Sequence, residues 1–219
     1  MTRGASLSLH GGHSSESCAH ARGTLDEVVE AAVRAGLSVF GVSEHAPRDR
    51  PEDLYPDEVE AGLGPGDLEA RFAAYADRRF AEVEARFVDR IALLKGMETE
   101  VVPATDWASR MRELRARHRI EYLVGSVHHV HGLPIDLDRA SWVRAAEISG
   151  GPEALALDYY RLQAEVLERL RPEVVGHFDY VKLLAPACEP PSPRVRRAID
   201  ENLELARAVG ALLEVNGKA

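Results

Sequence analysis

Three histidines lie within eleven residues near the start of this chain. His10, His13 and His20 stand among glycines and serines, directly after a short alternating apolar run that predicts a strand. Neutral imidazole is the commonest protein ligand for a divalent metal, so histidines at a strand end predict a metal site. A polar loop that is rich in histidine without binding metal is the alternative on this stretch alone.

Most of the other histidines also follow predicted strands. Besides the strand that begins at Leu7, short apolar runs predict strands at residues 38–42, 91–94, 120–124, 174–175 and 212–215. Side chains that could do chemistry come soon after four of these runs: His45, Glu98, His128 and His177. Of the nine histidines, only His118 falls within a predicted helix.

Amphipathic segments separate the strands. Thr24 and Glu27 form a capping box for the first predicted helix, and Asp67 is expected to cap the second; the helices are expected at residues 25–35, 67–89, 106–118, 152–170 and 193–209. Strand and helix in alternation require parallel strands with right-handed crossovers, so the fold class is α/β. The carboxyl ends of such strands share one face, above all in a barrel, so distant ligands are expected to meet there.

The segment between the second strand and the second helix is the least regular. Residues 47–66 hold four prolines and several acids, so a long loop or lid is expected at residues 48–66. Long loops in compact domains are more often functional than accidental. The helix that follows is expected to face the core with a stripe of aromatic residues: Phe72, Tyr75, Phe80 and Phe87.

Composition limits the class of protein. The chain of 219 residues is 45% hydrophobic, enough for one sizeable core, so a single domain over residues 1–219 is expected. Its net charge of −9 argues against nucleic-acid partners and membrane-surface binding, because nothing offsets phosphate repulsion. Cys18 and Cys188 are too few and too far apart for a disulfide framework. With no signal-peptide or membrane-spanning pattern, a soluble cytoplasmic protein is expected.

A set of short motifs at successive strand ends spans nearly the whole chain. The motifs are His10 with His13, Cys18-Ala19-His20, Ser43-Glu44-His45-Ala46-Pro47, Gly96-Met97-Glu98, Gly125-Ser126-Val127-His128 and Gly176-His177-Phe178-Asp179. In this order and context they resemble the polymerase-and-histidinol-phosphatase (PHP) superfamily. A Cys-x-His after the first histidine pair and a Gly-His-x-Asp after the fifth strand are most similar to its histidinol phosphatase branch.

That resemblance implies a distorted (β/α)7 TIM-like barrel with three divalent metal ions, which for mixed imidazole and carboxylate ligands are Zn, Fe or Mn. The ligands it implies are His10 and His13 for the first ion, His128 and His177 for the second, and His20 and His45 for the third. Glu98 would bridge the first two, since a carboxylate can span ions about 3.5 to 4 Å apart and an imidazole cannot. Glu98, His128 and His177 are accordingly the expected catalytic residues.

Four further residues are assigned by their places beside these motifs. Arg48 and Lys182 are expected to bind the substrate phosphate, with plain solvation as the alternative. Glu44 and Asp179 are expected to accept hydrogen bonds from ligand imidazoles and so to fix their tautomers, unless they are simply solvated acids.

Three residues next to the motifs are not expected to bind metal. His129 and His131 are expected to be loop or supporting residues, because side chains alternate in facing after His128. Cys18 is expected to pack beneath the N-terminal loop as a small buried residue.

The chain departs from the family pattern at two places. The family usually has His-x-His, whereas two glycines separate His10 from His13, so a bulge at Gly11-Gly12 is needed and which ring ligates is left open. The family also has a seventh strand ending in Asp-x-His, which is not found by residues 214–219, so the chain is expected to lack ~30 residues or more. A form without that strand is expected to be less stable and less active.

Three functions are compatible with these residues. The first is hydrolysis of L-histidinol phosphate to L-histidinol and phosphate, in histidine biosynthesis, by attack of a metal-bridging hydroxide on phosphorus. The second is the same chemistry on another small phosphoester, such as a nucleotide or sugar phosphate. The third is a metal-binding regulatory domain without turnover. The residues predict no oligomeric state.

Overall fold

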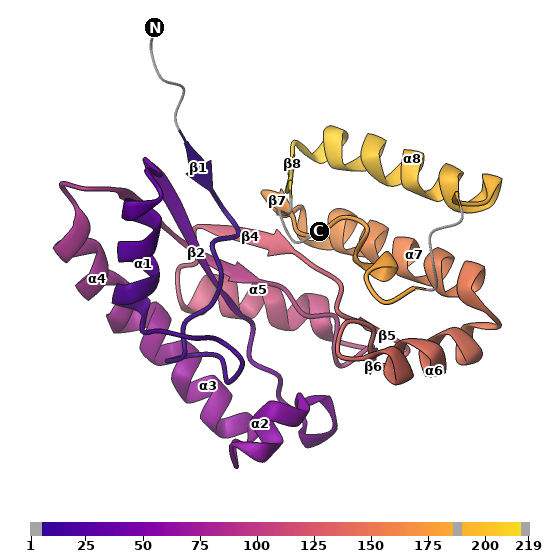
Figure 1. Ribbon diagram of the computed structural model, residues 1–219, viewed down its shortest axis with the longest axis horizontal. Helices are drawn as coiled ribbons and strands as arrows, with labels where there is room; N and C mark the ends of the chain where they lie inside the picture. The colour runs from indigo at the N-terminus through magenta and orange to yellow at the C-terminus, as the bar shows by residue number, and fades with distance from the viewer. Residues whose placement is uncertain (1–5, 186–189, 216–219) are drawn as a thin grey trace, which may run out of the picture. The chain divides into compact units, whose positions relative to one another are not determined.

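The computed structural model describes residues 6–185 and 190–215, and the chain divides into two compact units. The first comprises Met1–Glu98 with Met111–Val124, and the second Thr99–Arg110 with Gly125–Ala219. Figure 1 labels their helices and strands. No helix in the described part of the chain is both long and apolar enough to cross a membrane. The single domain over residues 1–219 stays a prediction.

Four parallel strands form the sheet of the first unit. Their order is β1 (Leu7–Ser8), β2 (Val39–His45), β3 (Ala92–Glu98) and β4 (Tyr122–Gly125). The register pairs His45 with Glu98, which are the last residues of β2 and β3. Because these strands run parallel, their carboxyl ends lie at the same edge of the sheet, as the alternation of strand and helix predicts.

Helix α1 (Leu25–Arg34) connects β1 to β2 and begins at the predicted capping box. The Thr24 hydroxyl accepts the Glu27 N–H at 3.3 Å, and the Glu27 carboxylate accepts the Thr24 N–H at 2.7 Å. These bonds satisfy two donors that a helix start would otherwise leave without partners. The local sequence therefore decides where this helix begins.

The helix predicted at residues 67–89 is one continuous helical run made of α3 (Pro65–Ala74), a π-helical turn (η2, Tyr75–Arg79) and α4 (Phe80–Phe87). It begins earlier than predicted, because Gly64 is the N-cap and donates its N–H to the Asp67 carboxylate at 2.8 Å. Pro65 suits the first helical position, where a missing N–H costs nothing. All four predicted aromatic residues of the stripe are buried.

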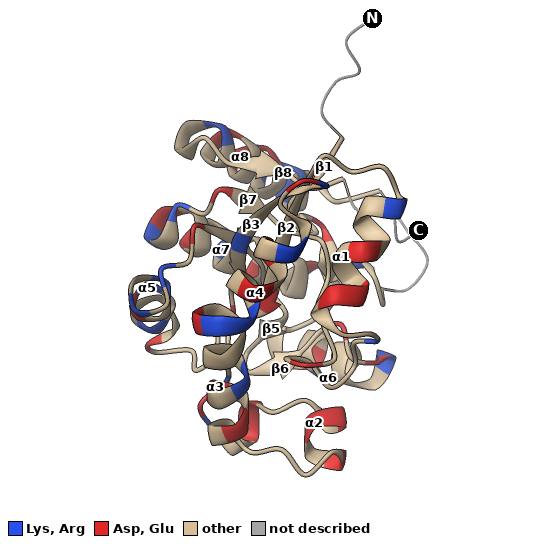
Figure 2. Cartoon of the chain, turned by 90° about the vertical axis from the view of Figure 1, so that its left-hand side faces the viewer, with Lys and Arg blue, Asp and Glu red and all other residues tan. Residues whose placement is uncertain are grey.

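The irregular loop predicted at residues 48–66 instead contains short helices. They are η1 (Pro51–Asp53), α2 (Pro56–Glu60) and the first residues of α3. Each begins with a proline, whose fixed φ suits the first turn of a helix. The prediction is therefore wrong for these segments, because the prolines that suggested a loop are helix starts. Three acids of this stretch, Asp57, Glu58 and Glu60, lie on α2, which carries red segments in Figure 2.

In its described part, the second unit holds two strand pairs and several helices. β7 (Val174–Val175) pairs with β8 (Leu212–Leu213) in parallel, and both α7 (Pro152–Leu170) and α8 (Pro193–Val209) have their predicted bounds. Leu167, Val175 and Ala206 form a buried cluster that joins α7, β7 and α8. Helix α5 (Trp107–Arg117) begins in this unit and ends in the first, just before His118.

A hairpin and a helix of the second unit are absent from the sequence-based expectations. β5 (His129–Val130) and β6 (Leu133–Pro134) form a hairpin, and α6 (Arg139–Ser149) follows it. Asp138 caps α6 by accepting the Ser141 N–H at 2.7 Å, and Gly150 ends it with a φ of 96°. Both cap residues are signals that the sequence carries. Cys188 and residues 216–219 lie outside the described residues.

The Tyr75 hydroxyl links the helical run to the sheet and generates a stability prediction. This buried hydroxyl lies 3.1 Å from Val42 O and 2.8 Å from Gly96 O, on β2 and β3. Tyr75→Phe is expected to lower the free energy of unfolding by about 1 to 2 kcal/mol, because a buried carbonyl loses its donor. Urea unfolding measures the change.

Tyr160→Phe is the matched control. The Tyr160 hydroxyl is buried and has no hydrogen-bond partner among residues 6–185 and 190–215, so its removal is expected to cost less than about 0.5 kcal/mol. Equal losses in the two variants would contradict the role given to the Tyr75 hydroxyl.

Candidate metal centre

The end of β3 places Glu98 against three imidazole rings of the first unit. Its Oε1 atom lies 3.2 Å from Nε2 of His10, and its Oε2 atom lies 3.2 Å from Nε2 of His13 and 3.3 Å from Nδ1 of His45. Glu98 is 1% exposed, so its charge depends on these neighbours rather than on water. The rings come from the end of β2 and from the segment after β1, the strand ends where the sequence predicts them.

The two glycines between His10 and His13 allow both rings to reach that carboxylate. A Cβ on Gly11 would lie 2.1 Å from the Phe40 ring, so only glycine fits there. Gly12 has a φ of 95°, a conformation that side chains rarely adopt. The longer spacer is therefore compatible with one shared site, and which of the two rings binds metal stays a prediction.

His20 contributes a fourth imidazole ring, which lies beside those of His13 and His45. Its ring centroid lies 5.9 Å from that of His13 and 5.5 Å from that of His45, while His13 and His45 stack at 3.9 Å. Ligand atoms of His13, His20 and His45 lie within 4.8 Å of one another, and so do those of His10, His13 and Glu98. Two overlapping groups of nitrogen and carboxylate donors at this spacing fit divalent ions such as Zn, Fe or Mn.

Glu44 holds the loop that carries these histidines. Its buried carboxylate accepts the Ser14 N–H at 3.0 Å and the Ser14 hydroxyl at 2.6 Å. Burial raises the pKa of Glu44. The charge of His13 and the hydrogen bonds from Ser14 act in the opposite direction, but burial is the larger effect. Nδ1 of His13 lies 3.8 Å from this carboxylate, which is too long for a hydrogen bond. The sequence predicts that Glu44 accepts a hydrogen bond from an imidazole. In the structure Glu44 instead accepts hydrogen bonds from Ser14, the neighbour of His13.

Cys18 lies beneath the same loop, as expected for a packing residue. It is 3% exposed, and its Sγ lies 3.1 Å from both ring nitrogens of His20. Burial raises the pKa of the Cys18 thiol to about 12. A raised thiol pKa disfavours the thiolate, which is the form of cysteine that binds metal.

A second group of imidazoles lies in the second unit. Nε2 of His128 is 3.2 Å from Nε2 of His177, and both side chains are buried. The buried Glu100 places Oε2 3.3 Å from Nδ1 of His128 and 3.6 Å from Nδ1 of His129. A carboxylate beside Nδ1 favours the proton on that nitrogen, which directs the Nε2 lone pair of His128 toward a ligand position. His129 and His128 both approach the same Glu100 oxygen, although alternate facing was expected, and the supporting role of His129 stays a prediction.

Sequence reasoning missed Glu100. The available signal was its context, because Glu100 stands two residues after Glu98 and directly before the apolar pair Val101 and Val102. All three residues are buried. An acid in such a position needs a polar partner, and that need is itself a reason to look for a site.

His177 is held by three neighbours of the second unit. Its N–H donates to Glu214 Oε2 at 2.6 Å, its carbonyl accepts the Tyr159 hydroxyl at 3.1 Å, and its ring stacks on Tyr180 with centroids 4.0 Å apart. His177 also has a φ of 25°, uncommon for a residue with a side chain. These contacts hold the ring in one orientation despite the unusual backbone.

The residues predicted to bind phosphate have protein partners here. Arg48 is 3% exposed, forms an ion pair with Glu58 and lies 4.4 Å above the Tyr55 ring. Lys182 lies 3.1 Å from Asp179 at the surface, so Asp179 contacts a lysine rather than an imidazole. Phosphate binding by Arg48 and Lys182 therefore stays a prediction, and their contacts give them structural roles as well.

The fold and the donor groups define an α/β protein with a histidine-rich candidate metal centre, and comparison with known proteins names its family. The model of the PHP domain matches residues 9–218, so the chain belongs to the PHP domain family. The predicted family and fold class are confirmed, including the distorted TIM-like α/β architecture.

Relatives support the same assignment. The Schizosaccharomyces pombe protein named "probable histidinol-phosphatase" is 36% identical over 212 residues, which cover 94% of this chain and 68% of that protein. The Saccharomyces cerevisiae histidinol-phosphatase is 28% identical over 243 residues, covering 96% and 72%. The crystal structure of HisK from Listeria monocytogenes has a TM-score of 0.69 at 16% identity, covers 97% of this chain and 81% of that one, and shows the fold.

The shared position of His13 in both donor groups generates a metal-binding prediction. His13→Ala is expected to weaken retention of divalent metal at least about tenfold, because each group loses a donor. Metal content after dialysis against graded chelator, measured by mass spectrometry, checks the outcome. His131→Ala is the control, since that exposed ring lies 2.9 Å from Asp158 and outside both groups. Similar metal loss in the two variants would refute the assignment.

Proposed function

We propose that this protein is a metal-dependent phosphomonoester hydrolase that converts L-histidinol phosphate and water to L-histidinol and phosphate. The observation that carries the proposal is the buried Glu98 carboxylate in contact with His10, His13 and His45 at the strand ends of a PHP-family chain. Two relatives that bear the name histidinol-phosphatase support the choice of substrate.

The residues proposed to hold metal are His10, His13, His20, His45, Glu98, His128 and His177. Three ions of Zn, Fe or Mn are proposed, in line with the mixed imidazole and carboxylate donors. When bound, such ions supply a lowered pKa for water and positive charge to balance the phosphoryl oxygens.

The chain's own side chains orient these donors. Glu98 divides its two oxygens, with Oε1 beside His10 and Oε2 beside His13 and His45, an arrangement suited to spanning two ions. The Glu100 carboxylate beside Nδ1 of His128 favours the proton on that nitrogen, which leaves the Nε2 lone pair to bind metal. For His128 this favours one tautomer and one orientation of the ring, which lowers the cost of assembling the site.

The wider context is part of the same proposal. A net charge of −9 disfavours nucleic acid and anionic membrane surfaces as partners and suits a small-molecule substrate that is drawn in by local metal charge. A cytoplasmic location is proposed, as for an enzyme of amino-acid biosynthesis.

Phosphate release from L-histidinol phosphate tests the function. Glu98→Gln is expected to lower kcat/KM at least about a hundredfold, because an amide cannot span two cations. The matched control is Glu201→Gln on the exposed face of α8, which is expected to keep the wild-type rate. Circular dichroism of both variants checks that the fold is kept.

A panel of other phosphomonoesters separates the related hypotheses. Faster hydrolysis of a nucleotide or sugar phosphate would overturn the choice of substrate but not the reaction class. Bound metal without turnover of any ester would favour the regulatory domain and defeat the enzymatic proposal.

A further inference from the structure

A π-helical turn interrupts the helical run of the first unit, and it contacts both the sheet and the histidine-bearing loop. The Phe80 N–H donates to Tyr75 O, five residues back, which defines the turn η2. π-Helical turns in proteins are frequent at functional sites. Through its hydroxyl, Tyr75 reaches β2 and β3, the strands that end in His45 and Glu98.

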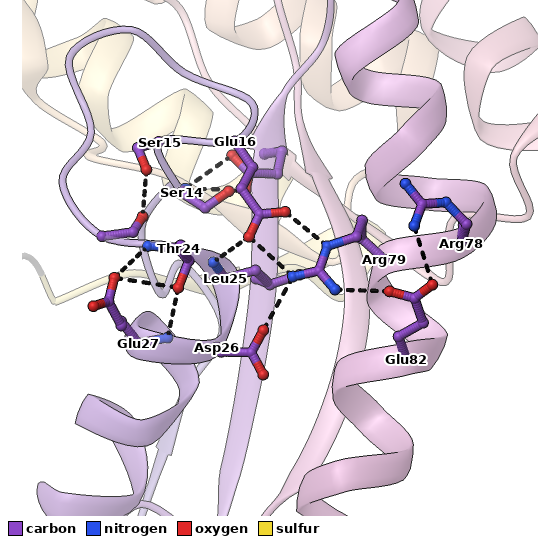
Figure 3. Close-up of polar contacts among 12 residues, drawn as sticks. Ser14, Ser15, Glu16, Thr24, Leu25, Asp26, Glu27, Arg78, Arg79 and Glu82 are labelled. Carbon is purple, nitrogen blue, oxygen red and sulfur yellow. Dashed lines mark hydrogen bonds and ion pairs between the residues drawn. The ribbon is translucent and has the colours of Figure 1, made fainter.

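The last residue of this turn, Arg79, reaches the loop between β1 and α1. Its Nε lies 2.8 Å from Glu16 Oε2 and its Nη2 lies 3.0 Å from Glu16 Oε1, the two parallel bonds that suit guanidinium and carboxylate. Arg79 also contacts Asp26 at 3.0 Å and Glu82 at 2.7 Å. Figure 3 shows Arg79 among these three acids, which come from the loop, α1 and α4.

Glu16 lies in the loop between His13 and His20. Besides Arg79, it binds the Leu25 N–H at 3.1 Å, the first residue of α1. Ser14 is held by Glu44, so two residues between His13 and His20, Ser14 and Glu16, are anchored by side chains from other elements. The bond from Arg79 lowers the pKa of Glu16, which keeps that carboxylate charged.

We propose that the contact between Arg79 and Glu16 is a positioning clamp that sets the places of His13 and His20 for metal binding. The proposal rests on the proposed function, because it takes these two histidines as metal ligands. Arg79 is 20% exposed on its side chain, so its bonds are more shielded from water and salt than an ordinary surface pair. Arg79 and Glu16 act through the loop that carries His13 and His20, as positioning residues.

The chain offers a matched pair without the loop contact. Arg90 makes two parallel bonds of 2.7 Å each to Glu30, and so also joins α1 to the end of the same helical run. Its side chain is 45% exposed, and it contacts no residue of the loop among the described interactions. In Figure 2, α1 carries red acidic segments. Its acids Asp26 and Glu30 pair with Arg79 and Arg90.

Cobalt binding by the full chain tests the clamp. Co²⁺ is titrated into metal-free protein, and affinity and visible absorption are recorded for wild type, Glu16→Gln and Glu30→Gln. Glu16→Gln is expected to weaken Co²⁺ binding about three- to tenfold and to change the absorption bands, because the ligand rings lose their set positions. Glu30→Gln is expected to change neither.

A second set of variants distinguishes an effect on the positions of the histidine rings from a general loss of stability. In a chain that carries His13→Ala and His20→Ala, Glu16→Gln is expected to have no further effect on Co²⁺ affinity, since the rings it acts through are gone. A persistent effect there, or equal effects of Glu16→Gln and Glu30→Gln in the natural chain, overturns the clamp. If Glu16→Gln is much less stable to urea than Glu30→Gln, Arg79→Lys replaces it, because lysine keeps the charge but loses the paired bonds.

Failure of the clamp and failure of the function are distinguishable. The cobalt measurement uses no ester, so a clear effect of Glu16→Gln together with inactivity of the wild type on every phosphomonoester would defeat the function alone. Hydrolysis of L-histidinol phosphate by a chain in which Glu16→Gln leaves the cobalt spectrum and affinity unchanged would defeat the clamp alone.

Discussion

The buried carboxylate of Glu98 is the constraint on which the first unit depends. A charge removed from water is costly unless partners compensate it, and removing a partner of such a group typically costs about 3 to 5 kcal/mol. The groups that lie beside its two oxygens are the rings of His10, His13 and His45. The parallel register of β2 and β3 provides part of this directly, because it sets His45 next to Glu98.

The surrounding contacts hold these partners in place from several directions. Glu44 fixes Ser14 next to His13, and the Tyr75 hydroxyl joins the strands that end at the site to the helical run. In the second unit, Glu100 supports His128 through the contact with its Nδ1 atom. A metal centre needs such support, because ligands that are held only by mobile loops bind metal more weakly. This explains why buried polar residues gather around the strand ends.

Local features of the structure could be predicted because their causes are local. The capping box of Thr24 and Glu27, the bounds of α7 and α8 and the strand before His177 follow from patterns of a few neighbouring residues. Such local patterns give a wrong prediction where one residue type is common in two kinds of structure. Prolines between residues 48 and 66 suggested a loop, yet they begin helices, because proline fits a turn and a first helical position equally well.

The sequence alone determined the α/β class, the family and the placement of histidines at strand ends, since periodicity and short motifs carry that information. Only the tertiary structure decided which side chains meet. Arg79 and Glu16 are 63 residues apart, and no local pattern predicts their contact. The same holds for the π-helical turn and for Glu100 beside His128, because such contacts depend on how helices and strands pack rather than on neighbours along the chain.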